Sequence, residues 1–199
     1  MNKKKWGGLI GVTCVVIISF IGLSNANYAS KDEKTNKFQA GHVDIEIQEV
    51  YTAPEKWTGE DHIKNVSIKN KSNVNTLLRA AIVPRWVDEN GAAWAGDASC
   101  VDITYAKEKW IKDTTTGYYY YNEIVKEEDS TKALIESVKA NIPTELQERY
   151  KGKKLIIDVK AETVIAKTKD SSNKYAFETA WSGINDDNGL KTMLTNLCN

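Results

Sequence analysis

The sequence predicts an all-β protein, namely an antiparallel β-sandwich with one to three short helices. Many short segments alternate apolar and polar residues, which is the two-residue period of a strand with one buried face. Polar turns separate these segments, and few stretches keep a helical spacing. Sheets built from such strands bury their apolar faces against each other, which gives a sandwich.

The first 26 residues have the layout of a secretory signal peptide. The basic start Lys3–Lys5 is followed by residues 7–23, which carry no charge, and by small side chains at the exit. The residues of the predicted cleavage site are Ser24, Ala26, Asn27 and Tyr28. A retained anchor is the alternative, because 17 uncharged residues approach the lower limit for a membrane span. Glycines within the segment favour cleavage, so we expect a secreted protein of the extracellular matrix or cell surface.

Charge limits the partners of the processed chain. Removing residues 1–26 from the 199-residue chain leaves 173 residues, enough for one domain with a real core. The full chain has 27 basic and 27 acidic residues, and three of the basic ones leave with the signal, so the net charge becomes −3. That charge is too small for an electrostatic grip on nucleic acid or anionic lipid. We therefore expect no nucleic-acid partner, and contact with a membrane only during export.

Residues 27–37 are predicted to form an extended N-terminal arm, because they are polar and lack a core pattern. The arm begins with Asn27, Tyr28, Ala29, Ser30, Lys31 and Asp32. Residues 38–199 are predicted to form the β-sandwich domain with a C-terminal helical extension. Its first strand contains Val43, Ile45 and Ile47 in alternation with polar residues. The pattern slips by one residue at Glu49–Val50, which predicts a bulge or the end of the strand.

The longest predicted strand covers residues 76–87, and Pro84 within it predicts an edge strand or a bulge, because proline cannot donate to a ladder. Further strands are predicted at 63–69, 101–105 and 155–166. Segments 107–113 and 118–126 flank a Thr-rich turn and predict a hairpin.

The run Tyr118–Tyr121 predicts two rings in the core and two towards solvent, since neighbours on a strand alternate faces. Aromatic packing across strands is favoured for this run, and a carbohydrate-binding stripe stays open.

Helices are predicted mainly near the C-terminus. Residues 130–142 are ambiguous between helix and strand. The sequence Thr144-Glu145-Leu146-Gln147 fits a capping box that opens a short helix ending near Gly152. Segments 174–184 and 189–198 are further candidates. The second contains an apolar stripe at helical spacing, formed by Leu190, Met193, Leu194 and Leu197.

Two cysteines stay in the processed chain, because Cys14 leaves with the signal. Cys100 and Cys198 form an even pair in an exported protein, which favours a disulfide between the C-terminus and the middle of the domain. Two unpaired thiols are the alternative.

Several segments, taken in order, resemble a known family. Ala26–Ser30 places an aromatic after a small residue at the signal exit, and the stretch from Phe38 to Ile45 reads aromatic-x-small-Gly-x-aliphatic-Asp-aliphatic. The defining positions of that stretch are Phe38, Gly41, Val43 and Asp44. A strand, an Asn turn and a second strand follow between residues 66 and 82, and the strand 155–166 completes the pattern. Over most of residues 1–166 the chain resembles the TasA/camelysin (CalY) family of SipW-dependent exported biofilm-matrix proteins, most closely its BsaA-type branch.

The resemblance implies a jelly-roll-like domain, processing by a SipW-type signal peptidase, and polymerisation into extracellular or pilus-like fibres. In this family an extended N-terminal segment of one subunit completes the sheet of the next by donor-strand exchange. The implied partner is therefore another copy of this chain in a head-to-tail homopolymer, alongside other matrix components. Ser30 stands where the family usually has an acidic residue, and the Cys100/Cys198 pair lies outside the shared pattern.

Composition offers little catalytic chemistry, so we expect no enzyme, no metal and no cofactor. Camelysin has been classed as a metallopeptidase, but zinc hydrolysis uses His-Glu-x-x-His or an equivalent, and this chain has only His42 and His62. Besides a secreted metalloprotease, the other alternative is a monomeric surface-binding module that uses the tyrosine-rich hairpin. A covalent amide between a lysine and an Asn or Asp is chemically open, but the sequence singles out no residues for it.

Overall fold

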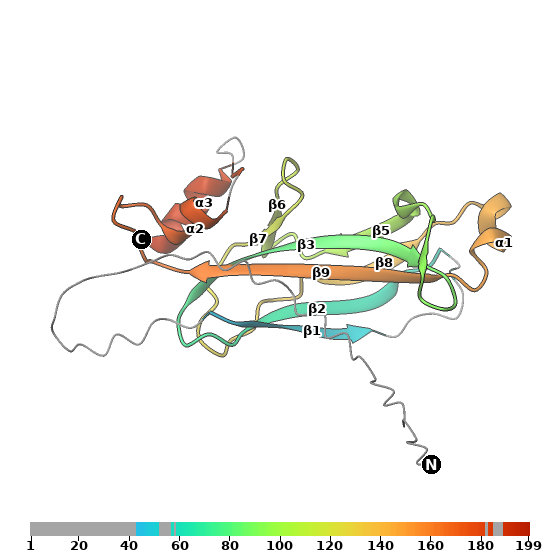
Figure 1. Cartoon of the computed structure of the whole chain (residues 1–199), viewed down its shortest axis with the longest axis horizontal. Coiled ribbons are helices and arrows are strands. Elements are labelled where there is room, and N and C mark those ends of the chain that lie inside the picture. The colour runs from blue at the N-terminus through green and yellow to red at the C-terminus, as the bar shows by residue number, and fades with distance from the viewer. Residues whose placement is uncertain (1–42, 52–56, 58, 182, 185–188) are drawn as a thin grey trace, which may run out of the picture. The chain divides into compact units, whose positions relative to one another are not determined.

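The two longest strands, β3 (Thr76–Val87) and β9 (Lys154–Ile165), pair antiparallel along their whole length and form the centre of one sheet. Figure 1 shows this arrangement in a computed structural model, which describes residues 43–51, 57, 59–181, 183, 184 and 189–199. All of these residues belong to one compact unit, Asn36–Asn199.

Two antiparallel sheets make up this unit. The first has the strand order β1-β2-β8-β5. Its strands are β1 (Ile45–Tyr51), β2 (His62–Asn70), β8 (Ile135–Ala140) and β5 (Val101–Tyr105). In the second sheet, β9 pairs with β3 along its whole length. The strands β4 and β7 also pair with β3, at different positions along it, and β6 pairs with β7. These strands are β4 (Ala93–Trp94), β7 (Tyr119–Tyr121) and β6 (Trp110–Lys112).

The predicted all-β sandwich with a few short helices is confirmed, because an apolar core fills the space between the two sheets. Its fully buried members from the central strands include Val66 and Ile68 on β2 and Leu78 and Ala80 on β3. Every second residue of these strands faces this core, as the alternation in the sequence predicts. The jelly-roll connectivity that the resemblance implies stays a prediction.

Pro84 lies on β3 where that strand has a described neighbour on one side only. β9 pairs with β3 throughout, whereas β7 pairs at Arg79 and Ala80 and β4 pairs at Trp86 and Val87. The gap between these two short strands makes this part of β3 a local edge, which is where a residue without an N–H donor is tolerated.

The structure resolves two ambiguous segments. Within residues 130–142 it forms a strand, β8, so the helical spacing there was coincidental. The slip at Glu49–Val50 is neither a bulge nor the end of the strand, because β1 keeps an unbroken register with β2 up to Tyr51. Since the register does not shift, Glu49 faces inward and Val50 faces outward.

Short helices occur within the predicted segments 144–152, 174–184 and 189–198, whereas η1 was not predicted. η1 is Ala98–Cys100, η2 is Thr144–Leu146, α1 is Gln147–Tyr150, α2 is Ala176–Ala180 and α3 is Leu190–Cys198. The predicted capping box at Thr144 is wrong, because Thr144 lies inside η2 and Pro143 at the N-cap has no side-chain cap bond. The capping box of the protein lies at α2, where the backbone N–H of Tyr175 donates to Glu178.

Helices α2 and α3 build a second apolar cluster against residues that β3 and β7 contribute from the face opposite the main core. Leu190 and Leu194 of the predicted stripe are buried there, beside Leu77 and Tyr120. This cover explains why Arg79, which the sequence places away from the core, is buried.

Arg79 is held in this second cluster by charge and by aromatic rings. Its Nε and Nη2 atoms donate to Glu162 Oε2 at 2.9 and 2.7 Å. Its guanidinium lies 4.0 Å from the ring centroid of Tyr118 and 5.1 Å from that of Trp181. Burial, followed by the hydrogen bond to Glu162, raises the pKa of Tyr118. Because the guanidinium of Arg79 has these partners, they offset the free-energy cost of burying its charge.

Replacing Leu194 tests how much α3 contributes to the fold. Leu194 is 0% exposed, so Leu194→Ala leaves a cavity between α3 and the sheet and is expected to lower the free energy of unfolding by about 2–5 kcal/mol. Urea denaturation followed by tryptophan fluorescence measures the loss. Leu197→Ala is the matched control on the same helix, because Leu197 is only partly buried, and a smaller loss is expected. Equal losses for both variants would contradict the role assigned to Leu194.

Candidate functional site

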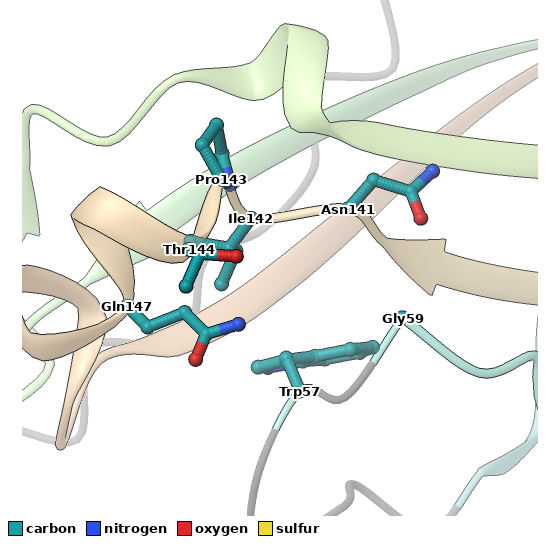
Figure 2. Close-up of a pocket in the computed structure, with 7 residues that line it drawn as sticks. All are labelled: Trp57, Gly59, Asn141, Ile142, Pro143, Thr144 and Gln147. Carbon is teal, nitrogen blue, oxygen red and sulfur yellow. The ribbon is translucent and has the colours of Figure 1, made fainter.

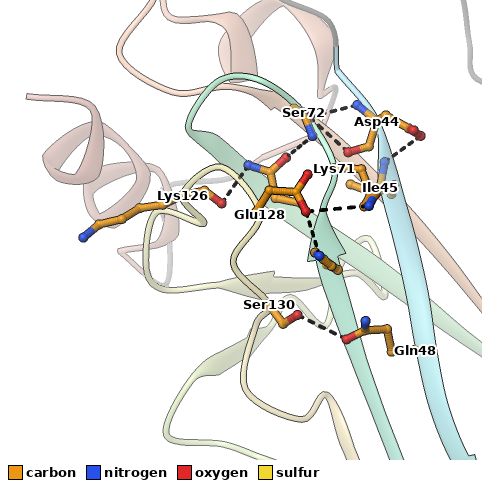
Figure 3. A network of polar contacts seen from close by, with 10 residues as sticks. Asp44, Ile45, Gln48, Lys71, Ser72, Lys126, Glu128 and Ser130 are labelled. Atoms are coloured by element: carbon orange, nitrogen blue, oxygen red, sulfur yellow. Dashed lines mark hydrogen bonds and ion pairs between the residues drawn. The ribbon is translucent and has the colours of Figure 1, made fainter.

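The backbone at the start of β1 is clamped by the turn that follows β2. Ser72 Oγ accepts a hydrogen bond from the backbone N–H of Asp44 at 2.8 Å and donates one to the Asp44 carbonyl oxygen at 3.0 Å. The same carbonyl accepts from the backbone N–H of Lys71 at 3.0 Å. Asp44 also caps itself locally, because its Oδ1 accepts from the N–H of Ile45. These contacts, seen in Figure 3, fix the backbone at the start of β1.

Asn70 organises this turn from inside the protein. Its side chain is 0% exposed, and its carboxamide nitrogen lies within hydrogen-bond distance of the carbonyl oxygens of Val74, Val125 and Lys126, at 2.9, 3.0 and 3.1 Å. Its Oδ1 accepts from the backbone N–H of Ser72 at 2.9 Å. Asn70 therefore joins the turn after β2 to the loop around residue 125 and sets the position of Ser72.

Surface charges reinforce the same region. Lys69 and Lys71 both pair with Glu128, with N–O distances of 2.7 and 3.6 Å. The hydrogen bond between Lys69 and Glu128 raises the pKa of the lysine and lowers the pKa of the glutamate. Ser130 donates to the side chain of Gln48 on β1 at 3.1 Å. Such exposed contacts contribute little to stability, but they align β1 with the neighbouring loop.

One edge of the sandwich is open, and β1 and β9 form it. Among the described strands, β1 pairs only with β2 and β9 pairs only with β3, so the outer backbone groups of both strands have no ladder partner. The two strands lie side by side across the gap between the sheets. Such a pair of free edges is a template for adding another strand.

The inner faces at this edge are incompletely covered. Ile47 on β1 pairs with the fully buried Ile68 and so faces inward, yet it is 40% exposed. On β9, Val159, Ala161 and Thr163 face the same interior and are only partly buried. An inward-facing isoleucine with this exposure leaves apolar surface that a further strand would cover.

At the opposite edge β5 and β6 also pair with one described strand each, but aromatic side chains fill the space between the sheets there. Tyr105 of β5 and Tyr119 of β7 join the two sheets in an edge-to-face contact, with ring centroids 4.9 Å apart. Trp110 of β6 and Tyr121 of β7 pack beside them, with centroids 5.0 Å apart. No ring pair between described residues joins β1 to β9 in this way, so the sandwich is asymmetric.

A buried charge lies just inside the open edge. The ammonium group of Lys64 on β2 forms an ion pair and hydrogen bond with Glu49 on β1, and it lies 4.3 Å from the ring centroid of Tyr51. The side chain of Lys64 is 3% exposed, whereas that of Glu49 is 41% exposed. Burial, followed by the charge of Glu49, raises the pKa of Tyr51. The pair therefore brings polar groups to the mouth of the gap.

The sequence-predicted processing and arm residues lie mostly outside the described residues. This holds for Ser24, Ala26, Asn27, Tyr28, Ala29, Ser30, Lys31, Asp32, Phe38 and Gly41. Val43 and Asp44 are described, and they lie where the chain enters β1. Sequence analysis missed Ser72 and Asn70 as parts of a clamp, although the polar turn was recognised. It also missed Lys64, whose signal is a lysine at a position that the alternation of β2 assigns to the core.

The predicted disulfide is absent, and both cysteines are free thiols. Cys198 packs in the second cluster with Leu77, near the start of β3. Cys100 is the last residue of η1, and the indole N–H of Trp86 donates a hydrogen bond to the carbonyl oxygen of Asp97, the N-cap residue of η1. Leu77 and Trp86 are nine residues apart on one strand, or about 30 Å at about 3.3 Å per residue. A disulfide needs Cα atoms within about 7 Å, so these thiols cannot meet. Burial also raises the pKa of Cys198.

The tyrosine run does not present a stripe of rings to solvent. Tyr119, Tyr120 and Tyr121 are all buried, because α2 and α3 cover the outer face of the strand while the main core covers the inner face. Tyr118 is partly buried and donates to Glu162 at 2.9 Å. The prediction of two solvent-facing rings was therefore wrong, and so was a binding surface made from this hairpin.

Across residues 43–51 and 59–181 and the other described positions, no group of three or more His, Cys, Asp or Glu side chains is placed to hold a metal ion. His62 packs edge-to-face on Trp57 with ring centroids 5.2 Å apart, and His42 lies outside the described residues. Within the described part of the chain, none of the helices has the length and apolar character needed to cross a membrane.

Comparison with known proteins adds no further identification. No family model, no curated protein and no solved structure matches this chain.

The clamp at the start of β1 can be tested with Ser72→Ala. This change removes both side-chain bonds to Asp44, and the expected loss in the free energy of unfolding is about 1–2 kcal/mol. Hydrogen exchange should become faster at the amides of Asp44 and Ile45. Ser67→Ala is the control on β2, since Ser67 has no part in the clamp. Unchanged exchange at Asp44 in the Ser72 variant would show that the clamp does not hold this entry point.

Proposed function

We propose that this chain is an exported structural subunit that assembles head to tail into fibres of an extracellular biofilm matrix. In this proposal, residues 27–37 of one processed subunit add as a strand to the open edge of the next subunit. The observation that carries the proposal is the pair of free strand edges, β1 and β9, with partly uncovered inner faces.

The lengths are compatible with this exchange. An extended chain rises by about 3.3 Å per residue, so the 11 residues of the arm reach about 36 Å. Strand β1 has seven residues and spans about 23 Å, so one arm can pair with its full length. Residues 38–42 then serve as a connection to the clamped start of β1.

Backbone pairing suits an arm of this composition. Residues 27–37 lack an apolar pattern, but strand addition gains its affinity mainly from main-chain hydrogen bonds. Ile47 and the inward residues of β9 supply the apolar floor. Because the arm and the acceptor edge are different surfaces of one subunit, the contact is heterologous and continues as a filament instead of closing as a dimer.

The assembly is tested with protein that begins at Asn27. Size-exclusion chromatography over a concentration series and negative-stain microscopy should show fibres, whereas deletion of residues 27–37 should leave a folded monomer. Fibres from the truncated protein would refute the exchange, and so would a processed protein that stays monomeric at every concentration.

The acceptor edge is tested separately with a synthetic peptide of residues 27–42 and the truncated protein. Ile47→Lys places an ammonium in the gap and should weaken peptide binding at least about tenfold. Val50→Lys is the matched control, because Val50 lies on the same strand, faces outward and is 74% exposed. Calorimetry measures both affinities, and circular dichroism checks that both variants are folded. Equal weakening by the two variants would show that the peptide binds elsewhere.

A further inference from the structure

Trp57 is anchored in an aromatic cluster at the end of the sandwich near α1. Its ring contacts Trp86 and His62 edge to face, with centroids 6.3 and 5.2 Å apart. Trp86 in turn contacts Tyr150, whose hydroxyl accepts from the backbone N–H of Asp97. Gly96 completes the cluster, since a Cβ there would lie 2.5 Å from the Trp86 ring. The ring of Trp57 is therefore held in place by the core.

A pocket of about 310 Å³ lies between Trp57 and the chain that connects β8 to η2. Figure 2 shows the Trp57 ring opposite this chain, with the Gln147 amide directed towards the space between them. The lining residues are Trp57, Gly59, Asn141, Ile142, Pro143, Thr144 and Gln147. None of these described residues carries a charge.

The polar groups of the pocket are of two kinds. Asn141 is fixed at one end, because its amide donates to Asp102 and its Oδ1 lies near Gly59. The side chains of Thr144 and Gln147 have no hydrogen-bond partner among the described residues and are exposed. A hydroxyl and a carboxamide together offer both donors and acceptors to a ligand.

We propose that this pocket binds neutral carbohydrate, with a sugar ring stacked on Trp57 and its hydroxyls hydrogen-bonded by Thr144 and Gln147. The apolar face of a pyranose matches an aromatic ring, while its hydroxyls both donate and accept, as the amide and the Thr hydroxyl require. The absence of charge from the described lining favours a neutral sugar over an acidic one.

The dimensions favour a short part of a longer chain. A volume of about 310 Å³ is at the lower end of the usual range for small-molecule sites, which is about 300–1,000 Å³. One or two sugar rings therefore occupy the pocket, and the open sides let a polysaccharide continue beyond it. A proline-rich peptide is the competing ligand, but such peptides dock in grooves lined by several aromatic rings, and Trp57 is the one ring among the described lining residues.

Calorimetry with processed protein beginning at Asn27 tests this site. The probes are hexasaccharides of glucose and of N-acetylglucosamine with different linkages, together with a decaproline peptide. At least one saccharide is expected to bind, and Trp57→Ala should weaken that binding at least about tenfold through loss of the stacking surface.

A second variant keeps the test valid if Trp57→Ala unfolds. Thr144→Ala combined with Gln147→Ala changes only exposed side chains, so its melting temperature should match that of the parent while saccharide binding falls. Gln48→Ala is the control, because Gln48 is an exposed glutamine on β1 that does not line the pocket, and this variant should bind saccharide as the parent does. Absence of binding to every saccharide, binding that neither pocket variant weakens, or binding of decaproline alone would each overturn the proposal. None of these outcomes depends on fibre assembly.

Discussion

The buried carboxamide of Asn70 is the constraint on which the N-terminal half of the structure depends. A fully buried amide must satisfy its donors and its acceptor inside the protein, because an unpaired group there costs about 1–3 kcal/mol. Asn70 meets this demand by bonding to the turn after β2 and to the loop near Val125, which brings Ser72 to the start of β1. The position of the start of β1 is therefore determined by the core.

The two edges of the sandwich are unequal for a physical reason. Tyr105, Tyr119 and Trp110 have side chains long enough to span the gap between the sheets and close one edge. At the other edge β9 offers Ala161 and Thr163, which are too short to do so, and β1 offers Glu49, which turns to Lys64. Small and polar inward residues keep this edge open, and strand addition would cover Ile47 without displacing any large side chain.

Sequence periodicity was sufficient for the strands and helices that bury one regular face. β3, β9 and α3 were predicted closely, because their apolar residues keep a period over nine residues or more. Periodicity failed where contacts between distant segments determine which way a side chain faces or whether it is buried. The register of β1 turns Glu49 inward, where Lys64 pairs with it, and Tyr120 of β7 is buried because α2 and α3 cover the outer face of the strand. The cysteines are free because Cys198 lies beside Leu77 and Cys100 lies near Trp86, at opposite ends of β3, and the sequence does not reveal these tertiary positions.

The two proposed sites were equally unavailable to sequence analysis, since each joins segments that are distant in the chain. The open edge combines β1 with β9, and the Trp57 pocket combines residue 57 with residues 141–147. The clamp and the pocket lie at opposite ends of β1, because Asp44 precedes that strand and Trp57 follows it. Strand addition uses backbone groups along β1, whereas the pocket uses side chains beyond its end. In the two proposals a neighbouring subunit and a polysaccharide are bound through different groups, so substitutions in the pocket are expected to affect saccharide binding and leave assembly unchanged.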